Sequence, residues 1–69
     1  MITYKRLWNL MAAKRISQYF LKANGISNST LTRLKRDEAV STETIDKLCA
    51  LLECNVEDIM EYYKKDTFA

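Results

Sequence analysis

Residues 17–36 read Ser-Gln-Tyr-Phe-Leu-Lys-Ala-Asn-Gly-Ile-Ser-Asn-Ser-Thr-Leu-Thr-Arg-Leu-Lys-Arg. Ser17 is a predicted N-cap, because its hydroxyl can accept a hydrogen bond from a free N–H in the first turn of a helix. The helix that follows is expected to end at Asn24-Gly25, since glycine tolerates the left-handed conformation of a sharp helix ending. Ser27 is the predicted cap of the next helix. Helix, glycine turn and capped helix in this order indicate a helix-turn-helix.

The outward face of the second helix follows from its geometry. If the stripe between Leu31 and Leu34 faces the core, a rotation of 100° per residue places only polar and basic side chains outside. Asn can pair with adenine edges, Arg with guanine N7 and O6, and Ser or Thr with several bases. Residues at the end of this helix would meet the phosphate backbone, as would Gln18 at the start of the preceding helix. The predicted DNA contacts are Gln18, Ser27, Asn28, Ser29, Thr32, Arg33, Lys35 and Arg36.

The charge distribution supports an anionic partner. Residues 1–36 contain eight Lys or Arg and no Asp or Glu, whereas residues 37–69 contain three Lys against nine acids. A basic half of this kind suggests a polyanion such as nucleic acid. The simpler alternative is that both halves are ordinary solvated surfaces. The charge asymmetry therefore supports nucleic-acid binding only in combination with the helix-turn-helix pattern.

Apolar residues at helical spacing predict the rest of the fold. A first helix places Tyr4, Leu7, Leu10 and Met11 on one face, and the short helix after Ser17 carries Tyr19, Phe20, Leu21 and Ala23, with Tyr19 packed or half-exposed. A helix that begins at Ser41 or Thr42 has Ile45, Leu48, Cys49 and Leu52 on one stripe, and a last helix is capped by Asn55 and carries Val56, Ile59, Met60 and Tyr63. The prediction is an all-α bundle of five short helices without strands, forming one domain over residues 1–69 with a loose tail at 67–69.

These residues resemble a known family. The pattern is similar to small Cro/CI-type (XRE-like) helix-turn-helix transcriptional regulators with the lambda-repressor-like fold, over residues 2–63. The residues that carry the resemblance are Tyr4 to Leu10, Ile16-Ser17-Gln18, Gly25 to Leu34, and Thr44 to Ile59. The last segment is similar to that of short, stand-alone regulators common in Firmicutes and mobile elements. The resemblance implies binding of operator DNA as a homodimer, with Asn28, Ser29, Thr32 and Arg33 at recognition positions and Gln18 as the backbone clamp.

The chain departs from the family pattern at one place. The usual spacing from the Ser of Ser-Gln to the turn glycine is nine residues, whereas Ser17 and Gly25 are eight apart. The family usually has alanine four residues before that glycine, where this chain has Leu21. Either the first helix of the motif is one residue short, or the loop before it is re-registered.

Composition argues against several other classes. A chain of 69 residues buries only about 60% of the surface that its unfolded form exposes, and it has no histidine, so we expect no enzyme, no metal and no cofactor. No apolar run approaches the roughly 20 residues of a membrane span, and the absence of a signal-peptide pattern favours a cytoplasmic, nucleoid-associated protein with reduced thiols. Cys49 and Cys54 would diverge by about 140° if both were helical, which argues against a disulfide. Cys49 lies on the apolar stripe and is expected in the core.

Two partners other than DNA remain open. The C-terminal residues Met60, Tyr62, Tyr63 and Phe68 are the predicted dimer surface, because they are more apolar than an isolated domain needs. An antitoxin-like adaptor could instead use the acidic C-terminal helix to bind a protein. RNA binding would normally use exposed stacking aromatics, and the face formed by residues 28–36 has none.

Overall fold

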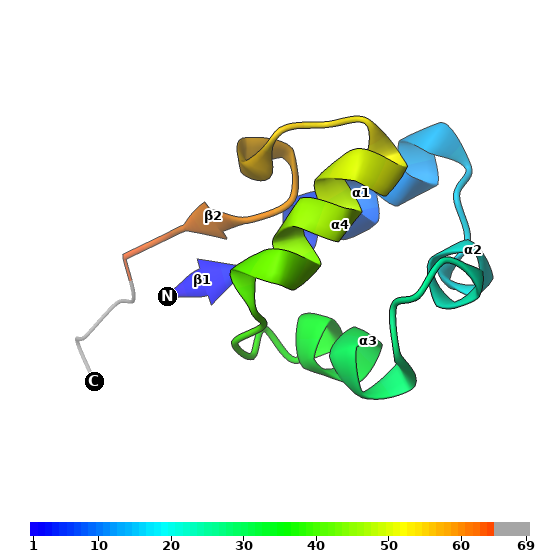
Figure 1. Cartoon of the computed structure of the whole chain (residues 1–69). Helices are drawn as coiled ribbons and strands as arrows, with labels where there is room; N and C mark the ends of the chain where they lie inside the picture. Colours follow the sequence, from blue (N-terminus) through cyan, green and yellow to red (C-terminus); the bar gives the residue numbers. More distant parts are fainter. Residues whose placement is uncertain (65–69) are drawn as a thin grey trace.

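A computed structural model describes residues 1–64 of the chain, and the described part is mostly helical. The elements are β1 (Ile2–Thr3), α1 (Lys5–Lys14), α2 (Gln18–Ala23), α3 (Asn28–Lys35), α4 (Thr42–Leu52), the 3-10 turn η1 (Val56–Asp58) and β2 (Glu61–Tyr62) (Figure 1). Residues 1–64 therefore form four α-helices, whereas five were predicted for the chain. The expected loose tail at 67–69 lies outside the described residues, and so does Phe68.

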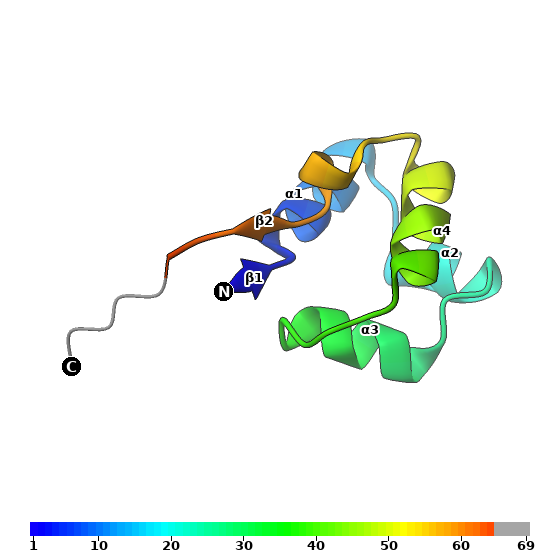
Figure 2. The same cartoon turned by 60° about the vertical axis from the view of Figure 1, so that its left-hand side comes forward.

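The core confirms most of the predicted inward faces of α1, α3 and α4, although Leu10 and Cys49 are only half-buried. Leu7 and Met11 of α1, Leu31 and Leu34 of α3, and the α4 stripe Ile45, Leu48 and Leu52 are all buried, together with Tyr4, Leu21, Ile26 and Ile59. The two views agree that α3 runs along one side of the molecule, with one flank toward the other helices and the opposite flank uncovered (Figures 1 and 2).

Serine caps begin three of the four helices. The hydroxyls of Ser17, Ser27 and Ser41 accept hydrogen bonds from the backbone N–H groups of residues 20, 30 and 44, each at 3.2 Å. Each bond satisfies one of the backbone donors that a helix start leaves free. The predicted starts of α2, α3 and α4 are therefore confirmed, and Ser41 rather than Thr42 is the cap of α4.

The prediction of a last helix is wrong, because only a single 3-10 turn forms after Asn55. Asn55 and Asp58 form the reciprocal capping box of a helix start, but only the 3-10 turn Val56–Asp58 follows. An α-helix would place Glu57 and Glu61 four residues apart on one face, where like charges destabilise a helix. The chain instead becomes extended and pairs with the N-terminus. Val56, expected to face inward, is exposed, whereas Ile59 is buried.

The two short strands join the ends of the described chain. β1 and β2 are antiparallel, with Ile2 opposite Tyr62 and Thr3 opposite Glu61. Met1 and Tyr63 extend the ladder, because each donates its N–H to the carbonyl of the other. Sequence periodicity could not predict this pairing, since it joins residues about 60 positions apart and involves only two residues per strand.

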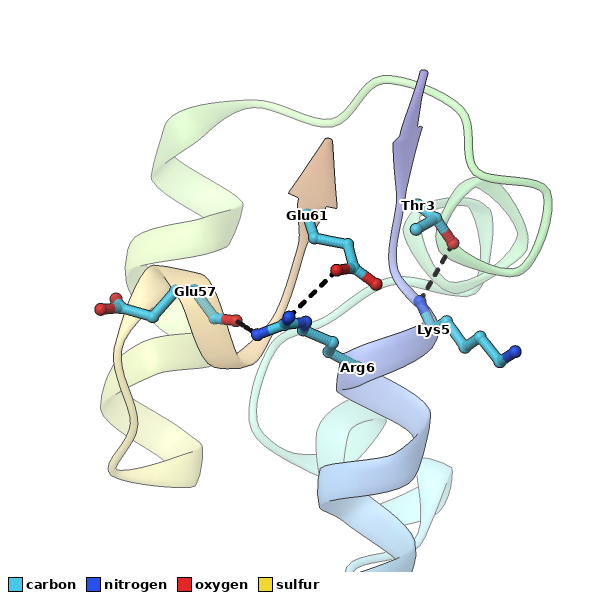
Figure 3. A network of polar contacts seen from close by, with 5 residues as sticks. All are labelled: Thr3, Lys5, Arg6, Glu57 and Glu61. Atoms are coloured by element: carbon cyan, nitrogen blue, oxygen red, sulfur yellow. Dashed lines mark hydrogen bonds and ion pairs between the residues drawn. The ribbon is translucent and has the colours of Figure 1, made fainter. Parts of the chain in front are cut away.

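Arg6 reinforces the same junction from α1. Its guanidinium donates to the carbonyl oxygen of Glu57 at 3.1 Å and forms an ion pair with the Glu61 carboxylate at 3.0 Å (Figure 3). Both side chains are about half exposed, so the ion pair itself contributes at most about 1 kcal/mol. Its main effect is to hold η1 and β2 against the first turn of α1.

Candidate nucleic-acid interface

The turn between α2 and α3 has the geometry that the sequence predicted. Gly25 has a φ of 101°, a conformation that L side chains rarely adopt. The N–H of Ile26 donates to the carbonyl of Leu21 at 3.0 Å, and the N–H of Gly25 donates to the carbonyl of Lys22 at 3.3 Å. Ile26 is buried under the corner. The turn is therefore tight, and its hydrogen bonds and the buried Ile26 side chain give α3 a defined orientation relative to α2.

The short Ser17–Gly25 spacing is accommodated within the motif. Ser17 caps α2 directly, so the loop before α2 is not re-registered. α2 itself has six residues, and Leu21 lies fully buried where the family usually has alanine. Gln18 is therefore the first residue of α2, half-buried, and its side chain makes no hydrogen bond with residues 1–64.

Two aromatic residues of α2 are more exposed than their apolar character suggested. Tyr19 has 77% of its surface exposed and Phe20 has 40%, so only Leu21 of the expected apolar set is buried. The expectation that Tyr19 would be packed or half-exposed is thus wrong. A helix of six residues is too short to bury a broad apolar stripe, and Leu21 alone reaches the core.

The side chains predicted to contact DNA from α3 are on its uncovered flank. All of Asn28, Ser29, Thr32, Arg33, Lys35 and Arg36 are exposed, whereas Leu31 and Leu34 are buried on the opposite side. The ion pair formed within residues 1–64 joins Arg6 to Glu61. The basic side chains of the α3 flank, Arg33, Lys35 and Arg36, therefore have no acidic partner among the described residues. The face presents three cations and several hydroxyl or amide groups to solvent.

Hydrogen bonds within α3 and its cap engage the hydroxyls of Ser27, Ser29 and Thr32, with those of Ser27 and Ser29 3.1 Å apart. The Ser27 hydroxyl accepts from the N–H of Thr30 and donates to the Thr30 hydroxyl at 2.9 Å, so its capping role occupies it. The Thr32 hydroxyl donates to the carbonyl of Asn28 at 3.0 Å and keeps its oxygen lone pair and methyl group for a ligand. Arg33 has no such internal bond within the described chain and is the residue of this face best suited to a bidentate contact.

Two residues near α3 position it, and sequence reasoning missed this role. Asp37 has a φ of 56° and ends α3, with the N–H of Glu38 returning to the carbonyl of Arg33 at 2.8 Å. The Asp37 carboxylate accepts from the N–H of Tyr4 at 3.0 Å, and the Tyr4 hydroxyl donates to the carbonyl of Glu38 at 2.9 Å. Burial raises the pKa of Tyr4, a backbone hydrogen bond opposes this, and the Asp37 charge adds to the rise.

The residues predicted to form the dimer surface differ in their solvent exposure. Tyr62 and Tyr63 are exposed, and Met60 is half-buried, while Phe68 lies outside the described residues. Met1 and Ile2, opposite the two tyrosines in the ladder, are exposed as well. The β1–β2 junction thus exposes apolar side chains from both ends of the described chain.

Comparisons with known proteins agree with this arrangement. Residues 6–65 match the family model of the Cro/C1-type HTH DNA-binding domain. Among solved structures, the crystal structure of the transcriptional regulator VanUg (Form II) is similar, with a TM-score of 0.81 and 33% identity over 87% of this chain and 81% of that chain. No curated protein matches the sequence. In the described part, none of the helices has the length and apolarity needed to cross a bilayer.

Proposed function

Because the chain belongs to the Cro/C1-type HTH DNA-binding domain family, we propose that it is a sequence-specific transcriptional regulator that inserts α3 into the major groove of double-stranded DNA. The observation that carries the proposal is the uncovered flank of α3, which is polar or basic throughout and contains no acid. We assign it a repressor-type action, since occupying an operator is sufficient to block transcription. No catalytic activity is proposed.

The exposed side chains of α3 divide into two roles. Asn28, Ser29, Thr32 and Arg33 lie where base edges would be read, with Arg33 directed at guanine. Lys35 and Arg36 at the end of the helix, and Gln18 at the start of α2, would contact phosphates and fix the register of the protein on the duplex. Ser27 contributes less to readout, because its hydroxyl is engaged in capping α3.

A homodimer on a palindromic operator completes the proposal. One domain of this size makes few phosphate contacts, so two half-sites about 34 Å apart would supply the missing affinity and specificity. The surface proposed for the dimer contact is the exposed apolar group at the β1–β2 junction, formed by Met1, Ile2, Tyr62 and Tyr63. Met60 is half-buried and would contribute only at the edge.

A protein partner is the second candidate. A groove of about 510 Å³ lies between α4 and the segment that leads into η1, and its lining includes Val40, Ile45, Val56 and Met60, with Asp46 among the polar members. An adaptor could use this groove to hold a partner with apolar and basic side chains. Such a role gives no reason for the acid-free flank of α3, so DNA binding is the better supported function.

Selection from a pool of random duplex DNA, followed by sequencing, tests the proposal. Repeating the binding at increasing salt counts the phosphates contacted, because the logarithm of the affinity falls with the logarithm of the salt concentration. An enriched palindromic motif is expected. Binding without any motif would show a protein that contacts only the backbone. No binding even at low salt would favour the protein partner.

A further inference from the structure

The end of α4 brings the two cysteines of the chain together. Glu53 adopts the left-handed conformation with a φ of 51°, and the N–H of Cys54 returns to the carbonyl of Cys49 at 3.1 Å. In this helix ending the side chains of the two residues joined by the outer hydrogen bond are frequently in contact, and here both cysteines line the same groove. The expected divergence of the two thiols is therefore wrong, because Cys54 has already left the helix.

Both thiols can be reached from solvent. Each cysteine is free and half-buried, and both line the groove between α4 and η1. Burial raises the pKa of the Cys54 thiol, and the contact with Cys49 and the charge of Asp58 add to this, while Lys14 opposes it. The backbone hydrogen bond from the N–H of Cys54 to the carbonyl of Cys49 and the groove that both side chains line place the two residues side by side. The pair is thus close, open to a small reagent and largely protonated at Cys54 near neutral pH.

We propose that Cys49 and Cys54 form a redox-active dithiol, which closes to an intramolecular disulfide by exchange with a low-molecular-weight disulfide such as glutathione disulfide. One cysteine thiolate attacks a sulfur of the reagent, forming a mixed disulfide and releasing one thiolate. The second cysteine thiolate attacks the protein sulfur of that mixed disulfide and releases the other. The two cysteines are oxidised by two electrons, and the reagent is reduced to two thiols.

The location of the pair defines what the disulfide would change. The C-terminal end of α4 lies on the side of the molecule away from α3 in both views (Figures 1 and 2). Closing the bond would tie the last turn of α4 to the segment before η1 and leave the uncovered flank of α3 untouched. The expected consequence is a more stable domain, because the cross-link restricts the unfolded chain. The inference does not depend on DNA binding.

Equilibration of the full chain in glutathione buffers of defined ratio tests the proposal. Acid quenching and intact mass measurement would separate the closed disulfide, which has lost two hydrogen atoms, from chains that carry glutathione. The same titration in urea provides the reference. If the fold holds the thiols together, the ratio of closed disulfide to mixed disulfide should be at least about tenfold higher in the native chain than in the unfolded one. The oxidised chain should also melt at a higher temperature than the reduced chain.

Two single variants serve as matched controls. Cys49→Ser and Cys54→Ser each keep one thiol and should stop at a single glutathione adduct. A closed-disulfide yield that is no higher in native buffer than in urea would overturn the proposal, as would native chains that accumulate two glutathiones. Products that appear only as covalent dimers, and decrease on dilution, would overturn it too.

Discussion

The carboxylate of Asp37, in the loop that leaves α3, accepts a hydrogen bond at 3.0 Å from the backbone N–H of Tyr4, the residue that precedes α1. The same carboxylate accepts from the hydroxyl of Thr3 at 3.3 Å. Tyr4 has no side-chain cap of its own to offer α1. Asp37 therefore places a negative charge at the start of α1, where the helix dipole favours it, and ties the end of α3 to the N-terminal segment.

Removing the Asp37 carboxylate should destabilise the fold. We expect Asp37→Ala to lower the free energy of unfolding by about 1–3 kcal/mol, because the N–H of Tyr4 loses its acceptor and alanine must adopt a positive φ. Asp37→Asn is the matched control, since asparagine keeps an oxygen acceptor and tolerates the left-handed conformation. Urea unfolding of the three proteins provides the measurement. Equal losses for both variants would show that the charge alone matters.

The Tyr4 hydroxyl predicts a specific alkaline sensitivity. Burial raises its pKa above the ordinary value of 10, so folding favours the protonated phenol. The stability that this shift contributes is complete below pH 10 and is lost as the pH rises through the folded-state pKa. Tyr4→Phe should therefore be less sensitive to alkaline pH than the unchanged chain.

At neutral pH the same variant should lose about 0.5–1.5 kcal/mol, because the hydrogen bond to the carbonyl of Glu38 is missing. Tyr62→Phe is the control, since Tyr62 is 71% exposed. Urea unfolding between neutral pH and pH values above 10 would reveal the difference. Parallel pH curves for Tyr4→Phe and the unchanged chain would contradict the assignment.

Arg33 and Lys35 should respond differently to truncation. Arg33→Ala is expected to weaken binding to the selected operator by about 1–3 kcal/mol and to relax the preference at one base pair. Lys35→Ala should weaken all sequences alike and reduce the salt slope by about one. Fluorescence anisotropy on the operator and on an unrelated duplex, at several salt concentrations, separates the two. Identical behaviour of the two variants would refute the division between base and phosphate contacts.

The β1–β2 junction should control the oligomeric state. Tyr62→Ser is expected to weaken the dimer by about 1 kcal/mol or more, because an exposed aromatic would be lost from the contact. Tyr19→Ser is the matched control, since Tyr19 is equally exposed but belongs to α2. Sedimentation velocity over a range of concentrations compares them. A monomeric profile of the unchanged chain at tens of micromolar would count against the dimer.

The parts of the fold that sequence predicted are local. Ser17, Ser27 and Ser41 act within three residues of themselves, and Leu31 and Leu34 follow from helical spacing. The exposed flank of α3 follows from the same spacing, at 100° per residue from the Leu31–Leu34 stripe. These features depend on backbone geometry that residues close in sequence determine. A single sequence is therefore enough to predict them.

The parts that sequence missed depend on contacts between distant residues. β2 forms because Met1 to Thr3 offer a partner strand, and Arg6 holds Glu57 and Glu61 from another element. The sequence placed Asp37 in a polar break, whereas its carboxylate accepts from the N–H of Tyr4 just before α1. Cys54 lies beyond the end of α4, because Glu53 adopts the left-handed conformation. None of these relationships has a periodicity that could reveal it.

Base-analogue substitution in the selected operator tests the central claim, that α3 reads the major groove, most directly. 7-Deazaguanine removes the N7 acceptor in the major groove and keeps the base pair, whereas inosine removes only the amino group in the minor groove. At the guanine read by Arg33, 7-deazaguanine should weaken binding about tenfold or more and inosine should have little effect. Arg33→Ala should be insensitive to both. Loss of binding with inosine but not with 7-deazaguanine would contradict the account.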